Sequence, residues 1–303
     1  MFLIATVIWG FAFVAQKEAT TIPAFTVGAV RSIMAMLFLA AMIPLTDRLI
    51  NSKRGAAEGK RKIPFNLNKR ELIGGSILGV LIVAASGVQQ MGLEDTDAGK
   101  AAFITALYVI IVPIMSAFLG KKPHLNAIIS VPVAVLGFYF LCLGPSVTLQ
   151  PSDLLLLLCA LIFSVHIIVV DRFSPDCDGM RISFVQFVVA SILNTAIALI
   201  FEGPVEIEPI LQGFGPLLYL GILSSGVGYT LQILAQKDAE PTVSSIFLSL
   251  ESVFGVIGGA MILGEKMSLR EYIGCAIVFA AIIISQFDFI EFLEKLKTKI
   301  KDN

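Results

Sequence analysis

Long apolar runs, separated by charged residues, glycine or proline, dominate the chain. A helix needs about 20 apolar residues to cross a bilayer, and only helices or closed barrels satisfy the backbone there. Runs such as residues 154–170 are continuously apolar, whereas barrel strands alternate. The pattern therefore predicts an all-α, polytopic membrane protein. Its ten transmembrane helices are expected at about residues 1–19, 23–46, 71–93, 98–120, 124–144, 152–170, 182–202, 213–236, 241–264 and 268–288.

Composition supports this prediction and excludes a soluble domain on a single anchor. Of 303 residues, 56% are hydrophobic and 15% charged, and the mean hydropathy is +0.88. The net charge of -1 gives no reason to expect nucleic acid as a partner. The four cysteines form no C-x-x-C pair, so we expect no disulfide and no metal, and no cofactor is indicated. The first run lacks a basic leader, which favours a first span over a cleaved signal peptide and leaves open a start codon further upstream.

Lysine and arginine are concentrated in connections on one side of the expected bundle. That side carries the basic link at residues 47–70, Lys121, Lys122, Arg172, Arg181, Lys237 and the tail lysines. The other side has Lys17, Lys100, Lys266 and Arg270. The positive-inside rule then predicts a plasma-membrane protein with both termini in the cytoplasm. The tail at 289–303 spaces apolar residues at helical intervals between lysines, so it is expected to lie as an amphipathic helix on the lipid of the inner leaflet.

The chain also contains a weak internal repeat. A shift of 144 residues pairs Phe103 with Phe247 and Leu119-Gly120 with Leu263-Gly264. Slightly different shifts pair Gly79 with Gly221, Gln90 with Gln232, Trp9 with Phe163 and Arg31 with Gln186. These matches are collinear and predict two five-helix repeats, at 1–144 and 150–288. Because five is odd, the second repeat enters the membrane from the opposite side, an arrangement typical of secondary transporters.

Several motifs carry a resemblance to a known family. They are residues 6–13 (TVIWGFAF), Arg31, the run from Thr105 to Pro113 before Gly120-Lys121, and Leu250-Glu251-Ser252 leading to Leu263-Gly264-Glu265. Together they resemble the EamA-type ten-helix members of the drug/metabolite transporter superfamily. The resemblance implies a fold of five plus five helices and transport of small metabolites, usually export of amino acids. Ser252 stands where the family commonly has proline, so a bend in this helix is expected at Gly255, Gly258 or Gly259 instead.

Three ionisable residues lie within the expected spans, where a charge costs at least about 2.5 kcal/mol. Arg31 is a candidate for binding substrate, and the alternative is a structural residue that holds the repeats together. Glu251 is a candidate for proton coupling, with a fixed ion pair to Arg31 or a packing hydrogen bond as alternatives. His166 is a candidate proton relay, although a lone buried histidine is more often a packing residue.

Uncharged candidates complete the expected substrate site. Trp9, Tyr108 and Tyr229 lie away from the interfaces and are expected to wall a cavity, with core packing as the even alternative. Mid-membrane amides at Gln90, Gln186 and Gln232 suggest a site between the repeats, or interhelical hydrogen bonds. Lys100 is expected at the outer mouth of the pathway, and its alternative role is a salt bridge to Glu94, Asp95 or Asp97.

The leading hypothesis is a secondary transporter of a small-molecule solute, driven by protons or by the solute's own gradient. The sequence contains no Walker A motif, no H-E-x-x-H motif and no G-x-S-x-G motif, so we expect no ATPase and no enzyme. The first alternative is an intramembrane enzyme with Glu251 and His166 as acid and base, and the second is a sensor without transport. The sequence does not specify the solute or the oligomeric state.

Overall fold

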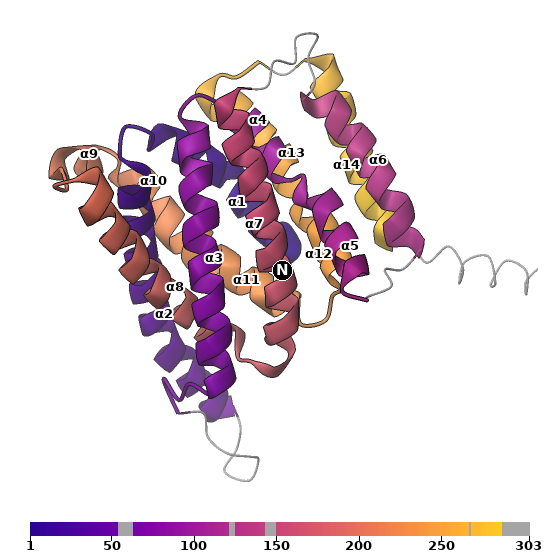
Figure 1. Ribbon diagram of the computed structural model, residues 1–303. Coiled ribbons are helices and arrows are strands. Elements are labelled where there is room, and N and C mark those ends of the chain that lie inside the picture. Colours follow the sequence, from indigo (N-terminus) through magenta and orange to yellow (C-terminus); the bar gives the residue numbers. More distant parts are fainter. Residues whose placement is uncertain (54–62, 121–124, 143–149, 267, 287–303) are drawn as a thin grey trace, which may run out of the picture.

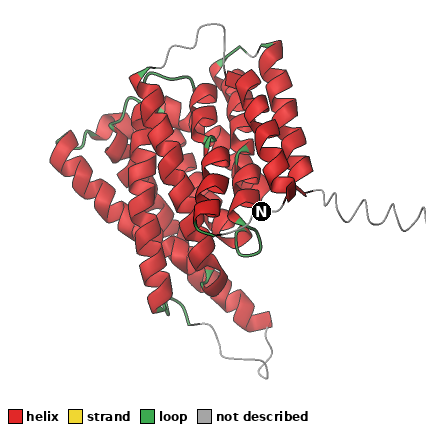
Figure 2. Cartoon of the chain, turned by 45° about the vertical axis from the view of Figure 1, so that its right-hand side comes forward, coloured by secondary structure: helices red, strands yellow, loops and turns green. Residues whose placement is uncertain are grey.

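The computed structural model describes residues 1–53, 63–120, 125–142, 150–266 and 268–286. The predicted tail helix at 289–303 lies outside the described residues, as do residues 54–62 of the basic link. Throughout the described part the regular structure is helical (Figures 1 and 2). The helices of the first half are α1 (Phe2–Glu18), α2 (Ala24–Lys53), α3 (Lys69–Leu93), α4 (Ala98–Thr105), α5 (Tyr108–Phe118) and α6 (Leu125–Cys142).

The second half has the same all-helical character. Its elements are α7 (Pro151–Phe173), the short 3-10 helix η1 (Ser174–Asp176), α8 (Gly179–Ile197), α9 (Ile207–Gln212), α10 (Phe214–Leu218), α11 (Tyr229–Ala235), α12 (Pro241–Leu248), α13 (Leu250–Gly258) and α14 (Leu269–Gln286), with π-helical stretches η2 (Ala198–Glu202), η3 (Tyr219–Gly228) and η4 (Gly259–Leu263). The predicted all-α class is confirmed for the residues that the structure describes.

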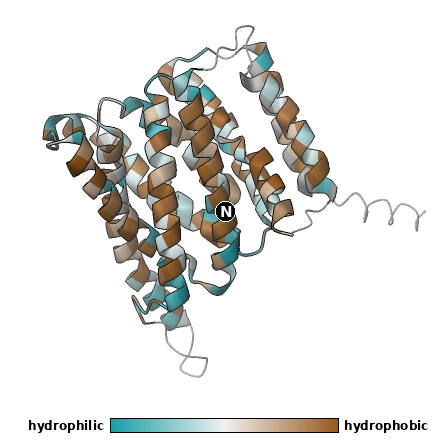
Figure 3. Ribbon diagram, viewed as in Figure 1, coloured by the Kyte–Doolittle hydropathy of each residue, from teal (hydrophilic) through white to brown (hydrophobic). Residues whose placement is uncertain are grey.

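Seven helical segments are long and apolar enough to cross a membrane, namely Ala24–Asn51, Lys69–Leu93, Ala98–Phe118, Pro151–Asp176, Gly179–Glu202, Phe214–Ala235 and Pro241–Leu263. Apolar residues cover the middle of these helices, and hydrophilic residues gather toward their ends (Figure 3). The prediction of a polytopic membrane protein is therefore confirmed. The remaining expected spans correspond to α1, α6 and α14, so ten transmembrane helices stay a prediction.

Side chains at the helix ends explain where several spans begin. At the start of α3, Asn68 accepts from the Glu71 backbone N–H while the Glu71 carboxylate accepts from that of Asn68. This capping box satisfies two of the N–H groups that a helix start leaves unpaired. Asp178 accepts from the Met180 backbone N–H and begins α8 in the same way.

Glycines set the close spacing of the helices. A methyl group added at Gly79 would lie 2.7 Å from the Gln186 carbonyl oxygen and equally close to Val189, so α3 packs on α8 nearly backbone to backbone. Gly75, four residues earlier, faces the same helix. This G-x-x-x-G spacing therefore serves close helix packing within one chain.

Two spans are interrupted near their middle. Residues 106 and 107 separate α4 from α5, and Ser249 separates α12 from α13. The expected bend at Gly255, Gly258 or Gly259 stays a prediction. In the structure α13 ends at Gly258 and the π-helical stretch η4 begins at Gly259, while Gly255 packs on Ala102 of α4 and Gly258 packs on Val14 and Phe11 of α1. The interruption at Ser249 has a different cause, since the Ser249 and Ser252 hydroxyls donate to backbone carbonyls three residues earlier and compete with the helical pattern.

Charged side chains join neighbouring helices at the end of the bundle where α3 and α8 begin. Buried Arg181 donates to Asp47 at 2.6 Å and to Asp178 at 2.9 Å, which ties α8 to the end of α2. Arg70 pairs with Asp176, and Lys237 donates to the Cys177 carbonyl oxygen. These basic residues all belong to the set expected at the cytoplasmic side, and that orientation stays a prediction.

At the opposite end a carboxylate joins the end of η4 to the start of α4. Glu265 accepts from the Ala98 and Gly99 backbone N–H groups at 3.1 and 3.4 Å. The carboxylate folds back over Gly259, where any Cβ atom would collide with it, and Gly264 makes the turn with a φ of 71°. The Glu265 carboxylate and Val256 both pack against Gly99 at the start of α4.

We predict that Gly79→Ala destabilises the protein, because the new methyl group overlaps the α8 backbone at a cost of roughly 1–3 kcal/mol. The thermal unfolding midpoint in detergent should fall by several degrees. Gly215→Ala is the matched control, since nothing lies within 4 Å of its added Cβ. Equal midpoints for the two variants would contradict the close α3–α8 contact.

Candidate functional site

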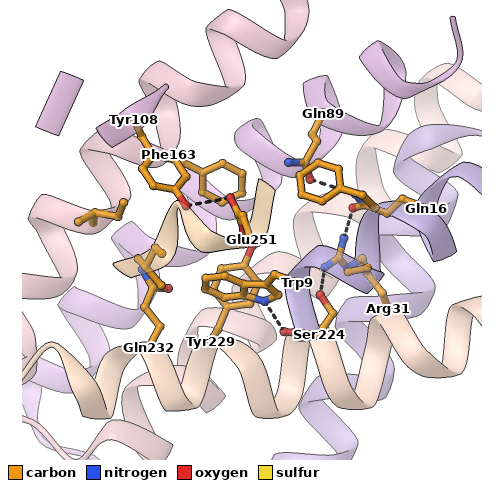
Figure 4. Close-up of a pocket in the computed structure, with 14 residues that line it drawn as sticks. Trp9, Gln16, Arg31, Gln89, Tyr108, Phe163, Ser224, Tyr229, Gln232 and Glu251 are labelled. Carbon is orange, nitrogen blue, oxygen red and sulfur yellow. Dashed lines mark hydrogen bonds between the residues drawn. The ribbon is translucent and has the colours of Figure 1, made fainter. Parts of the chain in front are cut away.

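One cavity lies in the middle of the bundle (Figure 4). The space that the centres of water molecules can reach is about 40 Å³, room for roughly three waters. Nearly every long segment contributes to its wall. The lining residues are Trp9, Ala12, Phe13, Gln16, Arg31, Gln89, Tyr108, Phe163, Ile167, Ser224, Tyr229, Gln232, Leu248 and Glu251.

Arg31 brings a positive charge from α2 into this cavity and is only 6% exposed. Its guanidinium donates to three neutral oxygens: Nε to Ser225 Oγ at 3.0 Å, one terminal nitrogen to Gln16 Oε1 at 3.0 Å, and the other to Ser224 Oγ at 3.2 Å. Among the described residues no carboxylate pairs with it. Its hydroxyl and amide partners hold the guanidinium in place but leave its charge uncompensated.

Glu251 brings a carboxyl group into the same cavity and is 5% exposed. It lies two residues after the interruption at Ser249, and its carboxylate accepts a hydrogen bond from the Tyr108 hydroxyl at 2.9 Å. No lysine, arginine or histidine of the described chain forms an ion pair with it. The alternative in which Glu251 is a fixed ion-pair partner of Arg31 is therefore wrong in this structure, and the packing hydrogen bond is the one observed.

Aromatic rings form the apolar part of the wall. The Trp9 and Tyr229 ring centroids are 4.7 Å apart, and the Trp9 indole N–H donates to the Ser224 carbonyl oxygen at 3.1 Å. Phe13 lies one helical turn after Trp9 and lines the cavity as well. Figure 4 shows Trp9 and Glu251 between Arg31 on one side and Tyr108 with Gln232 on the other. The predicted cavity-wall residues Trp9, Tyr108 and Tyr229 thus meet in one place.

Gln232 also reaches the cavity, as the sequence suggested. Its amide nitrogen donates to Gln236 at 2.9 Å, while its carbonyl oxygen is buried and has no partner in the structure. A buried acceptor without a donor is costly, so a bound water or solute N–H group is expected there.

Three polar lining residues were not predicted as substrate-binding residues from the sequence: Gln16, Gln89 and Ser224. Gln16 lies near the end of the first apolar run, where an amide resembles an ordinary interface residue. The signal that could have identified it is its spacing of seven from Trp9, which places both on one helix face. Gln16 donates to Gln89 at 3.2 Å, and Gln89 donates to the Thr105 hydroxyl at 3.3 Å.

Three predicted site residues lie beside the cavity without lining it. Gln90 donates to the Gln16 carbonyl oxygen at 3.0 Å. His166 and Gln186, both fully buried, are joined through His166 Nε2 and the Gln186 amide oxygen at 3.2 Å. The His166 ring packs on Tyr229, with 5.8 Å between centroids, and has no hydrogen bond to Glu251. The acid and base of the enzyme hypothesis are therefore not hydrogen-bonded to each other.

Lys100 lies at the start of α4, at the end of the bundle opposite Arg181 and Arg70. It pairs with Asp153 at 2.7 Å, so the expected alternative of a salt bridge to Glu94, Asp95 or Asp97 is wrong. The reason is that the Asp153 carboxylate is buried at the start of α7 and requires a compensating charge. In the described part of the chain, no group of three or more histidine, cysteine or acidic side chains is placed to hold a metal ion.

Comparisons with known proteins agree with this architecture. The model of the EamA-like transporter family matches residues 1–143 and again 150–287. An uncharacterized transporter of Archaeoglobus fulgidus is 28% identical, over 93% of this chain and 83% of its own. The uncharacterized transporter YoaV of Bacillus subtilis is 21% identical, over 94% of both chains.

Two further matches bear on location and fold. The uncharacterized inner membrane transporter YedA of Escherichia coli is 20% identical, over 92% of this chain and 87% of its own. A solved crystal structure superposes with a TM-score of 0.70 at 16% identity, covering 93% of this chain and 94% of that one. This last match concerns the fold alone.

We predict that Trp9, the chain's single tryptophan, emits at shorter wavelength than tryptophan in water and is weakly quenched by acrylamide, because its ring is buried against Tyr229. Steady-state fluorescence of the purified protein in detergent measures both properties. Trp9→Phe serves as the blank. Quenching as strong as in the denatured chain would show that the cavity wall is not formed as described.

Proposed function

Because the chain belongs to the EamA-like transporter family, we propose that this membrane transporter is secondary-active and exports amino acids or related small metabolites. The solute binds in the central cavity, which opens to each side of the membrane in turn. The family assignment makes the protein a transporter rather than an enzyme or a sensor. The solute class, the direction and the mechanism are our proposal.

The observation that carries the proposal is a guanidinium and a carboxyl group in one cavity, neither of which has an ion-pair partner among the described residues. Arg31 is bonded to neutral oxygens and Glu251 to a tyrosine hydroxyl. A buried charge without a counter-charge costs several kcal/mol, and each charge is therefore stabilised by an oppositely charged group of the solute. A zwitterion offers its carboxylate to Arg31 and its ammonium to Glu251. The rings of Trp9, Phe13 and Tyr229 suit an apolar side chain.

The small size of the cavity supports alternating access. Space for about three waters does not hold an amino acid, so the helices around it must separate before a solute enters. The interrupted spans, α4 with α5 and α12 with α13, pass the cavity beside Tyr108 and Glu251. Helix interruptions of this kind bring polar backbone and side chains to a transporter's substrate site.

The packing of the helices supports two inverted repeats, at 1–144 and 150–288. The expected repeats pair α1 with α7, α3 with η3, and α6 with α14. The contact of α3 with α7 then has its counterpart in the contact of η3 with α1, and the contact of α6 with α14 is its own counterpart. The glycines follow the same exchange: Gly79 packs on the Gln186 carbonyl oxygen, and Gly221 packs near that of Arg31. The sequence pairs these residues in the same way.

The energy source we propose is the proton gradient or the solute's own gradient. Glu251 is the coupling group, because protonation of its carboxylate competes with binding of the solute's ammonium group. His166 is a second candidate, behind Tyr229 and bonded to Gln186. Both termini are placed in the cytoplasm, with the tail at 289–303 on the lipid of the inner leaflet and Lys100 toward the outer mouth.

We predict that Arg31→Ala lowers uptake of a labelled amino-acid panel into proteoliposomes by at least about tenfold, because the variant lacks the charge that binds the carboxylate. Arg270→Ala is the matched control, since Arg270 stacks on Tyr139 and Phe140 away from the cavity. Unchanged transport by a folded Arg31→Ala variant would reduce Arg31 to a structural residue.

We predict that Glu251→Gln abolishes accumulation driven by an imposed pH gradient, while counterflow at saturating solute survives. The glutamine amide oxygen still accepts a hydrogen bond from an ammonium group, but it does not titrate. Glu206→Gln, an exposed position between α8 and α9, is the control for the same substitution. Loss of counterflow together with accumulation would assign Glu251 to binding alone, and wild-type behaviour in both assays would make it structural.

A further inference from the structure

The interruption between α4 and α5 has a hydrogen-bonded side chain on each side. Thr105 ends α4 and accepts from Gln89, and Tyr108 begins α5 and donates to Glu251. We infer that Gln16, Gln89 and Thr105 form a relay from Arg31 to this interruption, so that the two ends of a bound solute act on its two sides. The inference rests on the proposed zwitterionic solute and adds how binding drives the conformational change.

The relay is continuous and buried. It begins where Arg31 donates to Gln16 at 3.0 Å. Gln16 donates to Gln89 at 3.2 Å, and Gln89 donates to Thr105 at 3.3 Å. These residues come from four helices, α2, α1, α3 and α4, and all four side chains are at least nine-tenths buried. Because the bonds form one chain in a buried, low-dielectric environment, each polarises its neighbour, and a change in one bond alters the next.

A solute carboxylate competes with the first bond of the relay. The two terminal guanidinium nitrogens now donate to Gln16 and Ser224, which are neutral acceptors. A carboxylate forms charge-assisted, two-point hydrogen bonds with the same nitrogens, and such bonds are about twice as strong as neutral ones. Binding therefore releases the Gln16 amide, which is then free to reorient together with Gln89 and Thr105.

The other end of the solute acts on Tyr108. An ammonium group at Glu251 competes with the Tyr108 hydroxyl for the carboxylate oxygens. Residues 106 and 107 lie between the two affected side chains and belong to neither helix. The junction of α4 and α5 is accordingly the hinge that a zwitterion releases from both sides. A solute with only one of the two charged groups releases one side, so it binds but is carried slowly.

A substitution at Thr105 distinguishes an effect on the relay from an effect on solute binding. Thr105 is 1% exposed and does not line the cavity, so it acts as a positioning residue. Valine has the same shape but accepts no hydrogen bond, and serine restores the hydroxyl. Thr195→Val is the matched control, because Thr195 lies on α8 in a surface groove away from the cavity.

The test first screens the proteinogenic L-amino acids against the wild type by Trp9 fluorescence, and then follows the strongest binder in Thr105→Val. We expect its Kd to change by less than about twofold. The decarboxylated amine of the same amino acid should bind the wild type and show little turnover in proteoliposomes, because it leaves the Thr105 side of the hinge tied. In Thr105→Val that side is already released, so turnover of the amine should rise by at least about tenfold, and Thr105→Ser should restore the wild-type preference for the amino acid.

Two results would overturn the relay while leaving the proposed function intact: unchanged turnover of the amine in Thr105→Val, or turnover of the amine by the wild type as fast as that of the amino acid. Binding of no amino acid by the wild type would instead overturn the proposed solute class, and the relay with it. If Thr105→Val fails to fold, Gln89→Met breaks the same relay from the donor side. A Gln89→Met protein that carries the amine as slowly as the wild type does would equally contradict the inference.

Discussion

The rest of the structure depends on one constraint: a guanidinium and a carboxyl group are buried in the same cavity and do not pair with each other. In a bundle surrounded by lipid, water does not stabilise either charge, and each must be held by hydroxyl and amide groups of the chain. Arg31 obtains this support from Gln16, Ser224 and Ser225. The site is polarised before any solute binds. A solute with a group of opposite charge forms stronger hydrogen bonds there than the neutral groups of the chain do.

The surrounding helices keep this arrangement rigid at some places and leave it free at others. Glycine contacts hold α3 against α8, and the buried Arg181–Asp47 pair ties α8 to α2 at one end. The Glu202 carboxylate accepts from the Phe25 and Thr26 backbone N–H groups and ties the same two segments at the other end. The junction of α4 and α5 is held instead by single side-chain hydrogen bonds, from Gln89 to Thr105 and from Tyr108 to Glu251. The parts that hold Arg31 are thus distinct from the parts suited to bend.

The sequence predicted much of the fold because the bilayer imposes a strong constraint on it. Apolar runs of fixed length indicated the helical segments, and polar residues deep within them led to Arg31, Glu251, Tyr108 and Gln232, which all meet at the cavity. What it did not predict has two causes. The interruption at Ser249 arises locally, where hydroxyl groups compete with the helical hydrogen bonds. The other features depend on contacts between distant segments, as in the pairing of Lys100 with Asp153, 53 residues away. Gln16 was missed because its role appears only when α2 and α3 lie beside α1.

Because Glu265 contacts Gly259, the effect of a substitution at either position depends on the residue at the other. The carboxylate that reaches the start of α4 occupies the space a side chain at 259 would need. A substitution at 259 alone expels the carboxylate and leaves backbone N–H groups of α4 unpaired, whereas loss of the acid at 265 first removes the obstacle. Evolution can therefore change this pair in one order more readily than in the other, and the glycine is retained for as long as the acid is.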